Sequence, residues 1–184
     1  MSDLSALILC GGKSRRFGRD KAGVPFRGQP LIEHAYAVMD AVSDDVWLST
    51  NTPEAYRDSG RPMVGDIFLD RGPLGGLHAG LGVVRHDLMA VIACDMPFAS
   101  AELLRTLAED IGPADVAVPR CRGFLEPLHA VYRRSCRGAI EEALRAGHRR
   151  IVAFYPGVSV REVPVEEPGP FRNINVVTDL EEMG

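Results

Sequence analysis

The sequence predicts an α/β fold with a doubly wound, mostly parallel sheet, helices on both faces and an antiparallel addition in the C-terminal half. Two observations predict it. Short apolar runs alternate with segments of helical periodicity along the 184 residues, which is the order of a parallel sheet with right-handed crossovers. Several runs are also continuously apolar, as in Leu88–Cys94, which is typical of strands buried on both faces. The length fits one domain.

The first half of the chain contains four of these runs. Strands are expected at Leu4–Cys10, Val46–Thr50, Pro62–Val64 and Leu88–Cys94. Helices are expected at Pro30–Val42, at Pro53–Ser59 with its end at Gly60, and at Leu74–Val84. Because the last helix contains four glycines, we expect it to pack closely against a neighbouring element. Leu88–Cys94 is the most apolar strand and is expected near the centre of the sheet.

The second half continues the alternation less regularly. Ser100 is expected to cap a helix that runs to about Ala108, and another helix is expected at Ser135–Ala146 before Gly147. Strands are expected at Asp115–Pro119, Leu128–Tyr132 and Val158–Val165. The last of these alternates like an exposed strand, so this part is expected to add an antiparallel edge to a Rossmann-like sheet. The tail segment Asn173–Leu180 is expected to pair with or cap the rest.

Composition excludes several classes of protein. The chain is 46% hydrophobic and 25% charged, which excludes a disordered chain. The net charge is −4 and the pI is near 5.7, so a nucleic-acid partner is not expected. The apolar runs are far shorter than a membrane span, and no basic segment leads into an apolar one at the N-terminus. The four cysteines form no C-x-x-C pair, so free thiols in a reducing cytoplasm are expected. No pattern indicates an oligomeric state.

A glycine-opened basic segment follows the first predicted strand. Residues 13–21 carry five basic side chains and one acidic one, a net charge of +4, whereas the other residues, with 16 basic and 24 acidic side chains, carry −8. Gly11 and Gly12 allow backbone N–H groups to approach a phosphate closely, and Lys and Arg side chains neutralise the rest of a polyphosphate. The segment therefore predicts phosphate binding; the alternative is a glycine turn followed by a solvated basic loop.

Two common phosphate loops are excluded by spacing. The pattern G-x-x-x-x-G-K-[ST] fails because Arg16 or Phe17 stands where the second glycine must be. The pattern G-x-G-x-x-G fails because Gly11 and Gly12 are contiguous and the next glycine is Gly18. Neither a kinase-like nor a dehydrogenase-like loop is present.

Carboxylates follow two predicted strands, where ligands bind in such sheets. Asp95 comes directly after Leu88–Cys94 and is the best candidate for Mg²⁺, which takes one or two carboxylates with nucleotide phosphates. Asp66 occupies the matching place after the third strand and could contact a base or a ribose, or supply a second carboxylate position. The alternatives are an Asp95 that caps the turn before Pro97 and an Asp66 that forms a turn after Gly65.

A second glycine-rich segment opens the helix expected at Leu74–Val84. Arg71-Gly72-Pro73-Leu74-Gly75-Gly76 places Pro73 in the first turn. Glycines such as Gly75 let a flat ring lie on the backbone, or let the helix N-terminus meet an anion. Tight packing of helix on sheet is the alternative.

The sequence resembles the molybdenum cofactor guanylyltransferase family. Residues 9–21 are similar to the signature Gly-Gly-x-Ser-x-Arg-Met-Gly-x-Asp-Lys of nucleotidyltransferases that act on sugar nucleotides and related acceptors. The segments 72–76, 93–98 and 171–175 narrow the resemblance from nucleotidyltransferases in general to this family. The resemblance covers nearly the whole chain. Phe17 stands where methionine is usual, Val176-Val177 replaces a common Thr-Pro, and Ser49 stands where some relatives carry Asn, with Asn51 close by.

The resemblance implies an Mg²⁺-dependent transfer of GMP from GTP to the terminal phosphate of molybdenum-bound molybdopterin. It implies one nucleotidyltransferase domain over residues 1–184, with a nucleotide-binding half at 1–110 and an acceptor-binding half at 111–184. Asn173 and Asn175 would lie toward the pterin, and Asp95 would hold Mg²⁺. The residues expected to bind the nucleotide are Leu9, Cys10, Gly11, Gly12, Lys21, Asn51, Asp66, Gly75 and Asp95.

The expected mechanism needs no strong general base, because the attacking phosphate is already anionic. The amides of Gly11 and Gly12, with Arg16 and Lys21, would cradle the β- and γ-phosphates, while Asp95 with Mg²⁺ would act at the α-phosphate. No histidine shows ligand spacing, and each is expected to be structural. Those histidines are His34, His78, His86, His129 and His148.

Other functions stay open from the residues alone, since the preference for guanine rests on the resemblance. A molybdopterin cytidylyltransferase, a sugar-phosphate nucleotidyltransferase and a non-catalytic nucleotide-binding module are the alternatives. A further role in delivering the cofactor to molybdoenzymes is compatible with the enzyme.

Overall fold

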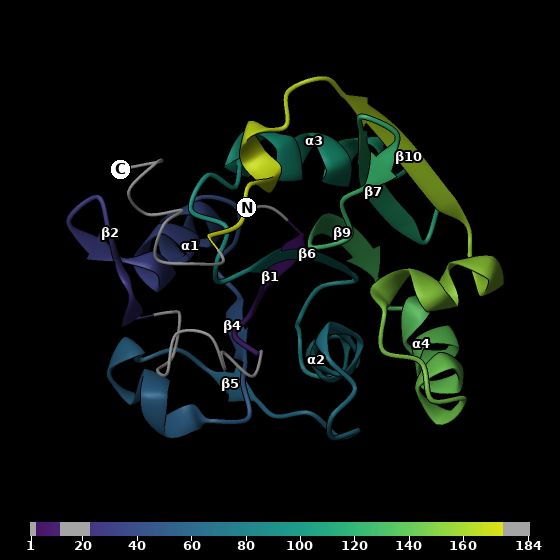
Figure 1. Ribbon diagram of the computed structural model, residues 1–184. Coiled ribbons are helices and arrows are strands. Elements are labelled where there is room, and N and C mark those ends of the chain that lie inside the picture. Colours follow the sequence, from purple (N-terminus) through teal and green to yellow (C-terminus); the bar gives the residue numbers. More distant parts are fainter. Residues whose placement is uncertain (1–2, 12–22, 175–184) are drawn as a thin grey trace.

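The computed structural model describes residues 3–11 and 23–174 and contains one large mixed sheet (Figure 1). The large sheet has eight strands in the order β10-β7-β9-β6-β1-β4-β5, with β8 paired to β7, and a separate hairpin joins β2 and β3. The strands are β1 (Leu4–Leu9), β2 (Pro25–Phe26), β3 (Gln29–Pro30), β4 (Val46–Ser49), β5 (Met63–Val64), β6 (Leu88–Ala93), β7 (Val116–Cys121), β8 (Phe124–Leu125), β9 (His129–Arg133) and β10 (Val160–Val165).

Helices connect most of the strands. The α-helices are α1 (Leu31–Asp40), α2 (Pro73–Leu81), α3 (Ala101–Asp110) and α4 (Cys136–Arg145), and the short 3-10 helices are η2 (Pro53–Ser59), η3 (Ile151–Gly157) and η4 (Gly169–Phe171). All the strands and helices expected within the described residues are present, with ends that shift by a few residues. The sequence did not predict β2, β3, β8, η3 and η4. The three strands and η4 span only two or three residues, too few to show a periodicity.

The sheet is mostly parallel and its C-terminal half adds the antiparallel strands β8 and β9, as predicted, but the strand at the edge is parallel. Strand β9 runs antiparallel between β6 and β7, whereas the edge strand β10 is parallel to β7. The expectation of an antiparallel edge is therefore wrong. The reason is connection length: β7 reaches β9 through a short hairpin, which requires an antiparallel return, whereas α4 and η3 form a connection long enough for β10 to pair in parallel.

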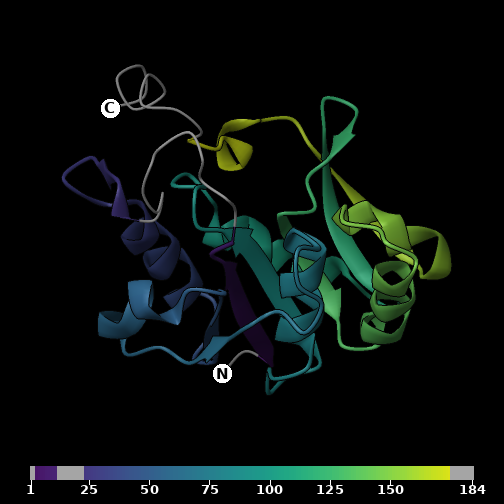
Figure 2. The ribbon, with the colours of Figure 1, turned by 60° about the horizontal axis from the view of Figure 1, so that its bottom comes forward.

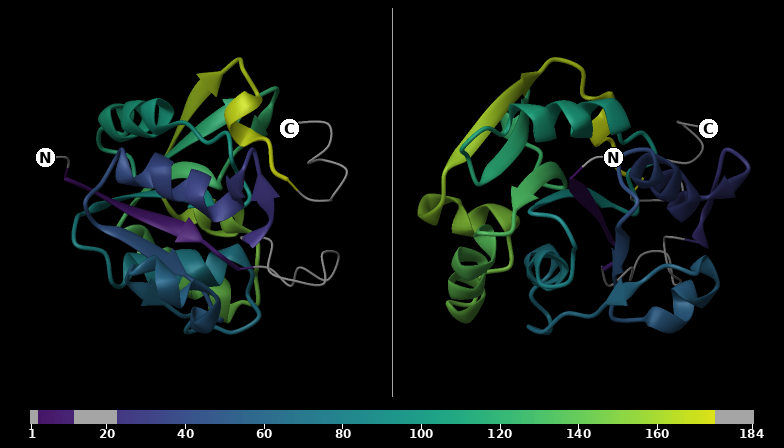
Figure 3. Two further views of the ribbon diagram at one scale, coloured as in Figure 1. Left: turned by 90° about the vertical axis from the view of Figure 1, so that its left-hand side faces the viewer. Right: turned by 180° about the vertical axis from the view of Figure 1, so that it is seen from behind.

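Helices cover both faces of the sheet. Alternate residues of β1 divide between two cores: Ala6 and Ile8 pack in the core that includes α1 and α3, and Leu7 and Leu9 pack in the core that includes α2 and α4. Figure 1 shows α1 and α3 on one side of the sheet and α2 and α4 on the other, and the right panel of Figure 3 shows the same layers from behind. Leu7 and Ile8 are fully buried, and each such side chain contributes about 1.5–3 kcal/mol.

Helix α2 lies unusually close to β1 and β4, as its glycines predict. A Cβ atom at Gly76 would lie 2.5 Å from Ser49 Oγ and 2.8 Å from Leu9 Cδ2. A Cβ atom at Gly80 would overlap the side chain of Leu7. These positions therefore accept glycine alone without a shift of the helix.

Local signals end or begin several helices where the sequence predicts. Ser100 Oγ accepts the Leu103 N–H at 3.1 Å at the start of α3. Gly60 and Gly147 adopt positive φ angles of 64° and 89° after η2 and α4. All four cysteines are free and buried, as expected. Among the described residues, no helix has the length and apolar character needed to cross a bilayer.

Candidate active site

The site lies where the strand order reverses. From β1 the chain proceeds to β4 and β5 on one side and then returns to β6 on the other side of β1. In open α/β sheets this reversal opens a crevice at the carboxyl ends of the two central strands. The Cys94 N–H donates to Leu9 O at 3.1 Å, so the ends of β1 and β6 are adjacent. Cys10 and Gly11 thus leave the sheet beside Cys94 and Asp95.

Other segments rise from the same edge. Figure 2 shows η4 and the β7–β8 hairpin at this edge, with the N-terminus of β1 at the opposite edge. In the left panel of Figure 3 the arrow of β1 points toward the side of the β2–β3 hairpin. Gly11 is exposed, and an added Cβ atom would have no neighbour within 4 Å among the atoms present.

Asn51 and Asp66 come together at the ends of β4 and β5. Asn51 Nδ2 donates to Asp66 Oδ2 at 3.0 Å, and the Asp66 N–H donates to Asn51 Oδ1 at 2.9 Å. Burial raises the pKa of Asp66, and the hydrogen bond from Asn51 opposes this shift. Gly75 in α2 completes the group, since a Cβ atom there would lie 3.2 Å from Asp66 Oδ2. The sequence suggested each residue separately but not this pairing.

Asp95 lies in the loop between β6 and α3, and the C-terminal segment is attached to it. The Ile174 N–H donates to Asp95 O at 2.9 Å, and Ile174 is fully buried. This bond brings Asn173, expected on the pterin side, to the same edge as Asp95. The structure therefore places one expected acceptor residue beside the expected metal residue.

His129 connects three segments around this loop. It is fully buried at the start of β9, and its Nε2 accepts the Ser100 N–H at 3.0 Å. Its ring contacts the ring of Phe171 edge-on, with centroids 5.5 Å apart. Burial lowers the pKa of His129 to about 4, so the imidazole is neutral at pH 7. The residue therefore joins β9, the start of α3 and η4, and it pairs with Ile92 of β6.

Four of the expected site residues lie outside the described residues, and nothing structural is assigned to them. They are Gly12, Arg16, Lys21 and Asn175. The described members of the expected set all lie at the carboxyl edge of the sheet or, for Gly75, on the helix beside it.

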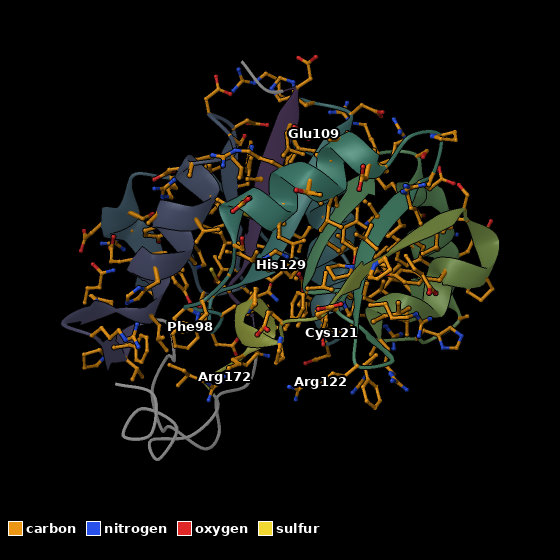
Figure 4. All side chains as sticks on the ribbon, turned by 90° about the horizontal axis from the view of Figure 1, so that it is seen from above. Phe98, Glu109, Cys121, Arg122, His129 and Arg172 are labelled. Atoms are coloured by element: carbon orange, nitrogen blue, oxygen red, sulfur yellow. The ribbon has the colours of Figure 1, made fainter. Side chains whose placement is uncertain are left out.

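Residues from the C-terminal half of the chain also lie at this edge, and no sequence motif indicated them. Phe124 and Glu126 follow the turn of the β7–β8 hairpin, and Phe124 is 74% exposed. Figure 4 shows Phe98, Cys121, Arg122 and Arg172 at this end of the molecule, around η4. Glu126 is a single carboxylate after the two-residue strand β8 and belongs to no motif, so the sequence analysis did not identify it.

Comparisons with known proteins identify the family to which the chain belongs. The family model described as "MobA-like NTP transferase domain" matches residues 6–161. A molybdenum cofactor guanylyltransferase of Pseudomonas putida is 40% identical over 151 residues, which is 80% of this chain and 79% of that protein. Its counterpart in Syntrophotalea carbinolica is 34% identical over 186 residues, covering 96% of this chain and 89% of that protein.

A solved structure shows the same fold over nearly the whole chain. Molybdopterin-guanine dinucleotide biosynthesis protein A from Archaeoglobus fulgidus has a TM-score of 0.82 and 29% identity, and the match covers 97% of this chain and 95% of that one. The CMP:2-keto-3-deoxy-manno-octonic acid synthetase structure, at 15% identity and a TM-score of 0.75, shares the fold alone. This chain therefore belongs to the molybdenum cofactor guanylyltransferase family of MobA-like NTP transferases.

Proposed function

We propose that this protein transfers GMP from GTP to the terminal phosphate of molybdenum-bound molybdopterin. An oxygen of that phosphate attacks the α-phosphorus of GTP, a new P–O bond forms, and the bond to the β-phosphate oxygen breaks to release pyrophosphate. The observation that carries the proposal is the contact between the ends of β1 and β6, with Cys94 N 3.1 Å from Leu9 O. This contact supports the proposal because Gly11, which starts the glycine-opened segment, and Asp95 follow adjacent strands at the same edge of the sheet.

The phosphates are assigned to the loop after β1. The amides of Gly11 and Gly12, with Arg16 and Lys21, would hold the β- and γ-phosphates and stabilise the departing pyrophosphate. The attacking phosphate is anionic at neutral pH, so alignment and charge neutralisation supply the catalysis. This agrees with a site edge whose one buried histidine is neutral and engaged with Ser100.

The donor set at this edge fits Mg²⁺. Asp95 is a half-buried carboxylate that follows the end of β6 next to the end of β1, and within residues 3–11 and 23–174 no three His, Cys, Asp or Glu side chains gather into a metal site. Mg²⁺ commonly takes one or two carboxylates and completes its shell with phosphate oxygens and water. Asp95 would hold the ion, which when bound would neutralise charge at the α-phosphate.

The base is assigned to the group formed by Asn51, Asp66 and Gly75. Guanine offers its N1–H and 2-amino donors side by side, and a carboxylate accepts both. The hydrogen bond from Asn51 holds the Asp66 carboxylate in place, and Gly75 leaves room beside it. Cytosine and uracil lack this pair of donors, so the group favours guanine over the bases of the alternative transferases.

Substitution of Lys21 tests the phosphate assignment. Lys13 and Lys21 are the only lysines of the chain, which makes Lys13→Ala the matched comparison for Lys21→Ala. We expect Lys21→Ala to lower the rate of GMP transfer by at least about 100-fold with an unchanged melting temperature, and Lys13→Ala to have a much smaller effect. Near-normal transfer by Lys21→Ala would exclude Lys21 from the proposed role.

Metal and base dependence separate the remaining alternatives. Asp95→Asn is expected to lose Mg²⁺-stimulated transfer, and unchanged stimulation would contradict the Asp95 assignment. Titration of the wild-type protein with GTP, CTP and UTP should show preference for GTP, whereas preference for CTP would favour a cytidylyltransferase. Binding without any transfer would indicate a non-catalytic module.

We also propose a cytoplasmic location and transfer of the product to molybdoenzymes. The four free thiols fit a reducing compartment. Capture of an apo-molybdoenzyme by the product-loaded protein, and not by the protein without product, would test the delivery role.

A further inference from the structure

Glu126 is fixed at the acceptor half of the site edge by backbone hydrogen bonds. Its N–H donates to Pro119 O at 2.9 Å, and its carbonyl accepts the His129 N–H at 3.0 Å. His129 pairs with Ile92 across β9 and β6. Glu126 lies three residues before His129 and Asp95 lies three residues after Ile92, so both carboxylates leave the sheet at the same edge from adjacent strands.

The strand pattern places Glu126 on the side of its hairpin opposite to Leu125. Leu125 packs against the core that contains α2 and α4. Because side chains alternate along an extended strand, Phe124 and Glu126 share the opposite side. Phe124 is 74% exposed, the most exposed large hydrophobic side chain among the described residues. The hairpin is held by Arg120, whose Nη1 donates to Gly123 O at 2.8 Å while its Nη2 donates to Glu162 Oε1 at 2.7 Å.

The carboxylate of Glu126 has no partner within the part of the chain that the structure describes. It is half-buried, and burial raises its pKa. Two other carboxylates that are not fully exposed have donors: Asp45 accepts from Ser5 and Trp47, and Asp115 accepts from Ser135 and Ser159. A half-buried carboxylate without a donor destabilises the fold, so folding alone does not explain it.

The chemistry of the acceptor supplies the missing donors. A pterin carries N3–H and a 2-amino group side by side, and these match the two oxygens of one carboxylate. We propose that Glu126 recognises this edge of the pterin in the acceptor, with the exposed ring of Phe124 available to stack on the heterocycle. The inference rests on the proposed function, because it identifies the residue that selects the acceptor in that reaction. Glu126 is thus a specificity-determining residue and takes no part in bond making.

A pair of analogues tests the recognition directly. Neopterin monophosphate has both donors, whereas its lumazine counterpart carries an oxo group in place of the 2-amino group and would oppose a carbonyl to the carboxylate. Fluorescence titration of the wild-type protein should show at least about tenfold tighter binding of the pterin. In Glu126→Gln, which keeps the side-chain shape, pterin affinity should fall about tenfold and the preference over lumazine should largely disappear.

Glu109→Gln is the matched control. Glu109 is exposed near the end of α3, and Figure 4 shows it at the opposite end of the molecule from Arg122 and Arg172. Its substitution should change neither the pterin affinity nor the preference. Equal behaviour of Glu126→Gln and Glu109→Gln would overturn the inference.

Steady-state kinetics distinguish this inference from the proposed function. With molybdenum-bound molybdopterin as acceptor, Glu126→Gln should raise the KM for the acceptor about tenfold and leave the KM for GTP unchanged. Normal transfer by the wild-type protein with an unchanged acceptor KM in Glu126→Gln would overturn the role of Glu126 alone. Absence of GMP transfer in the wild-type protein would instead refute the proposed function. A loss of Mg²⁺ affinity in Glu126→Gln would show that the carboxylate holds the metal and would also overturn the inference.

Discussion

Asn51 and Asp66 hold each other across the ends of β4 and β5 through two hydrogen bonds of 3.0 and 2.9 Å, in which each residue both donates and accepts. The two residues are 15 positions apart in the chain and meet because β4 and β5 pair in parallel. The pairing orients the Asp66 carboxylate. The hydrogen bond from Asn51 also opposes the effect of burial, which disfavours the charged form. It makes the orientation of Asp66 depend on Asn51.

Asn51→Ala should therefore weaken nucleotide binding, although Asn51 is not assigned to the phosphates. The substitution removes the donor to the Asp66 carboxylate and the acceptor of the Asp66 N–H, and we expect the Kd for GTP to rise about tenfold. Isothermal titration with GTP measures the effect, and Glu54→Ala, an exposed change three residues away, should leave the Kd unchanged. If Asn51→Ala binds GTP with the wild-type Kd, Asp66 is not the residue that binds the base.

Asp66→Asn should raise stability and lower nucleotide affinity together. The pKa of Asp66 is raised in the folded protein, so the folded state holds this proton up to a higher pH than the unfolded chain. The charged carboxylate consequently destabilises the fold at neutral pH, and this penalty disappears as the pH falls through the raised pKa. Thermal melts should show a higher melting temperature for Asp66→Asn at pH 7 and a smaller difference near pH 4. A lower melting temperature at pH 7 would show that the Asn51 bond outweighs burial.

Two glycine substitutions should have opposite effects on stability. Gly80→Ala places a Cβ atom against Leu7, 2.9 Å from Cδ1, and should destabilise the protein by about 1–3 kcal/mol because α2 must move from β1. Gly138→Ala, in the exposed part of α4 with nothing within 4 Å of the new Cβ, should stabilise it by about 0.5–1 kcal/mol. Urea unfolding compares the two. Equal effects would mean that α2 does not depend on its close approach to the sheet.

His129 should make the protein sensitive to mild acid. Its pKa is lowered from 6.5 to about 4 by burial, so the unfolded chain takes up a proton on this residue before the folded protein does. Stability should be lost as the pH falls from about 6.5 to about 4, by roughly 3 kcal/mol from this residue. The pKa of His78 is lowered as well and adds a loss of the same sign.

His129→Gln is expected to remove the His129 part of this pH dependence, at the cost of lower stability at pH 7. Urea unfolding at pH 7 and pH 4.5 measures the difference in the free energy of unfolding. The exposed His148 provides the control, since His148→Gln should leave the pH dependence as in the wild-type protein. An unchanged difference in His129→Gln would show that the imidazole is already protonated in the fold.

The sequence alone determined the succession of strands and helices along the chain. It also determined the edge of the sheet at which Asp66 and Asp95 lie. These features are encoded over a few neighbouring residues: apolar runs, the Ser100 cap, and a carboxylate directly after a strand. Since parallel strands end at a common edge, the position of each carboxylate in the chain predicts its place in the fold.

Only the tertiary structure decided which of these segments touch. The position of β9 inside the sheet, the Asn51–Asp66 pair and the contact of Phe171 with His129 join residues that are distant in sequence. Such contacts depend on how the whole sheet buries its apolar surface, and local periodicity does not specify that. The Glu126 carboxylate, which finds no donor within residues 3–11 and 23–174, belongs to the same class, because the surroundings of a side chain depend on segments that are distant in sequence.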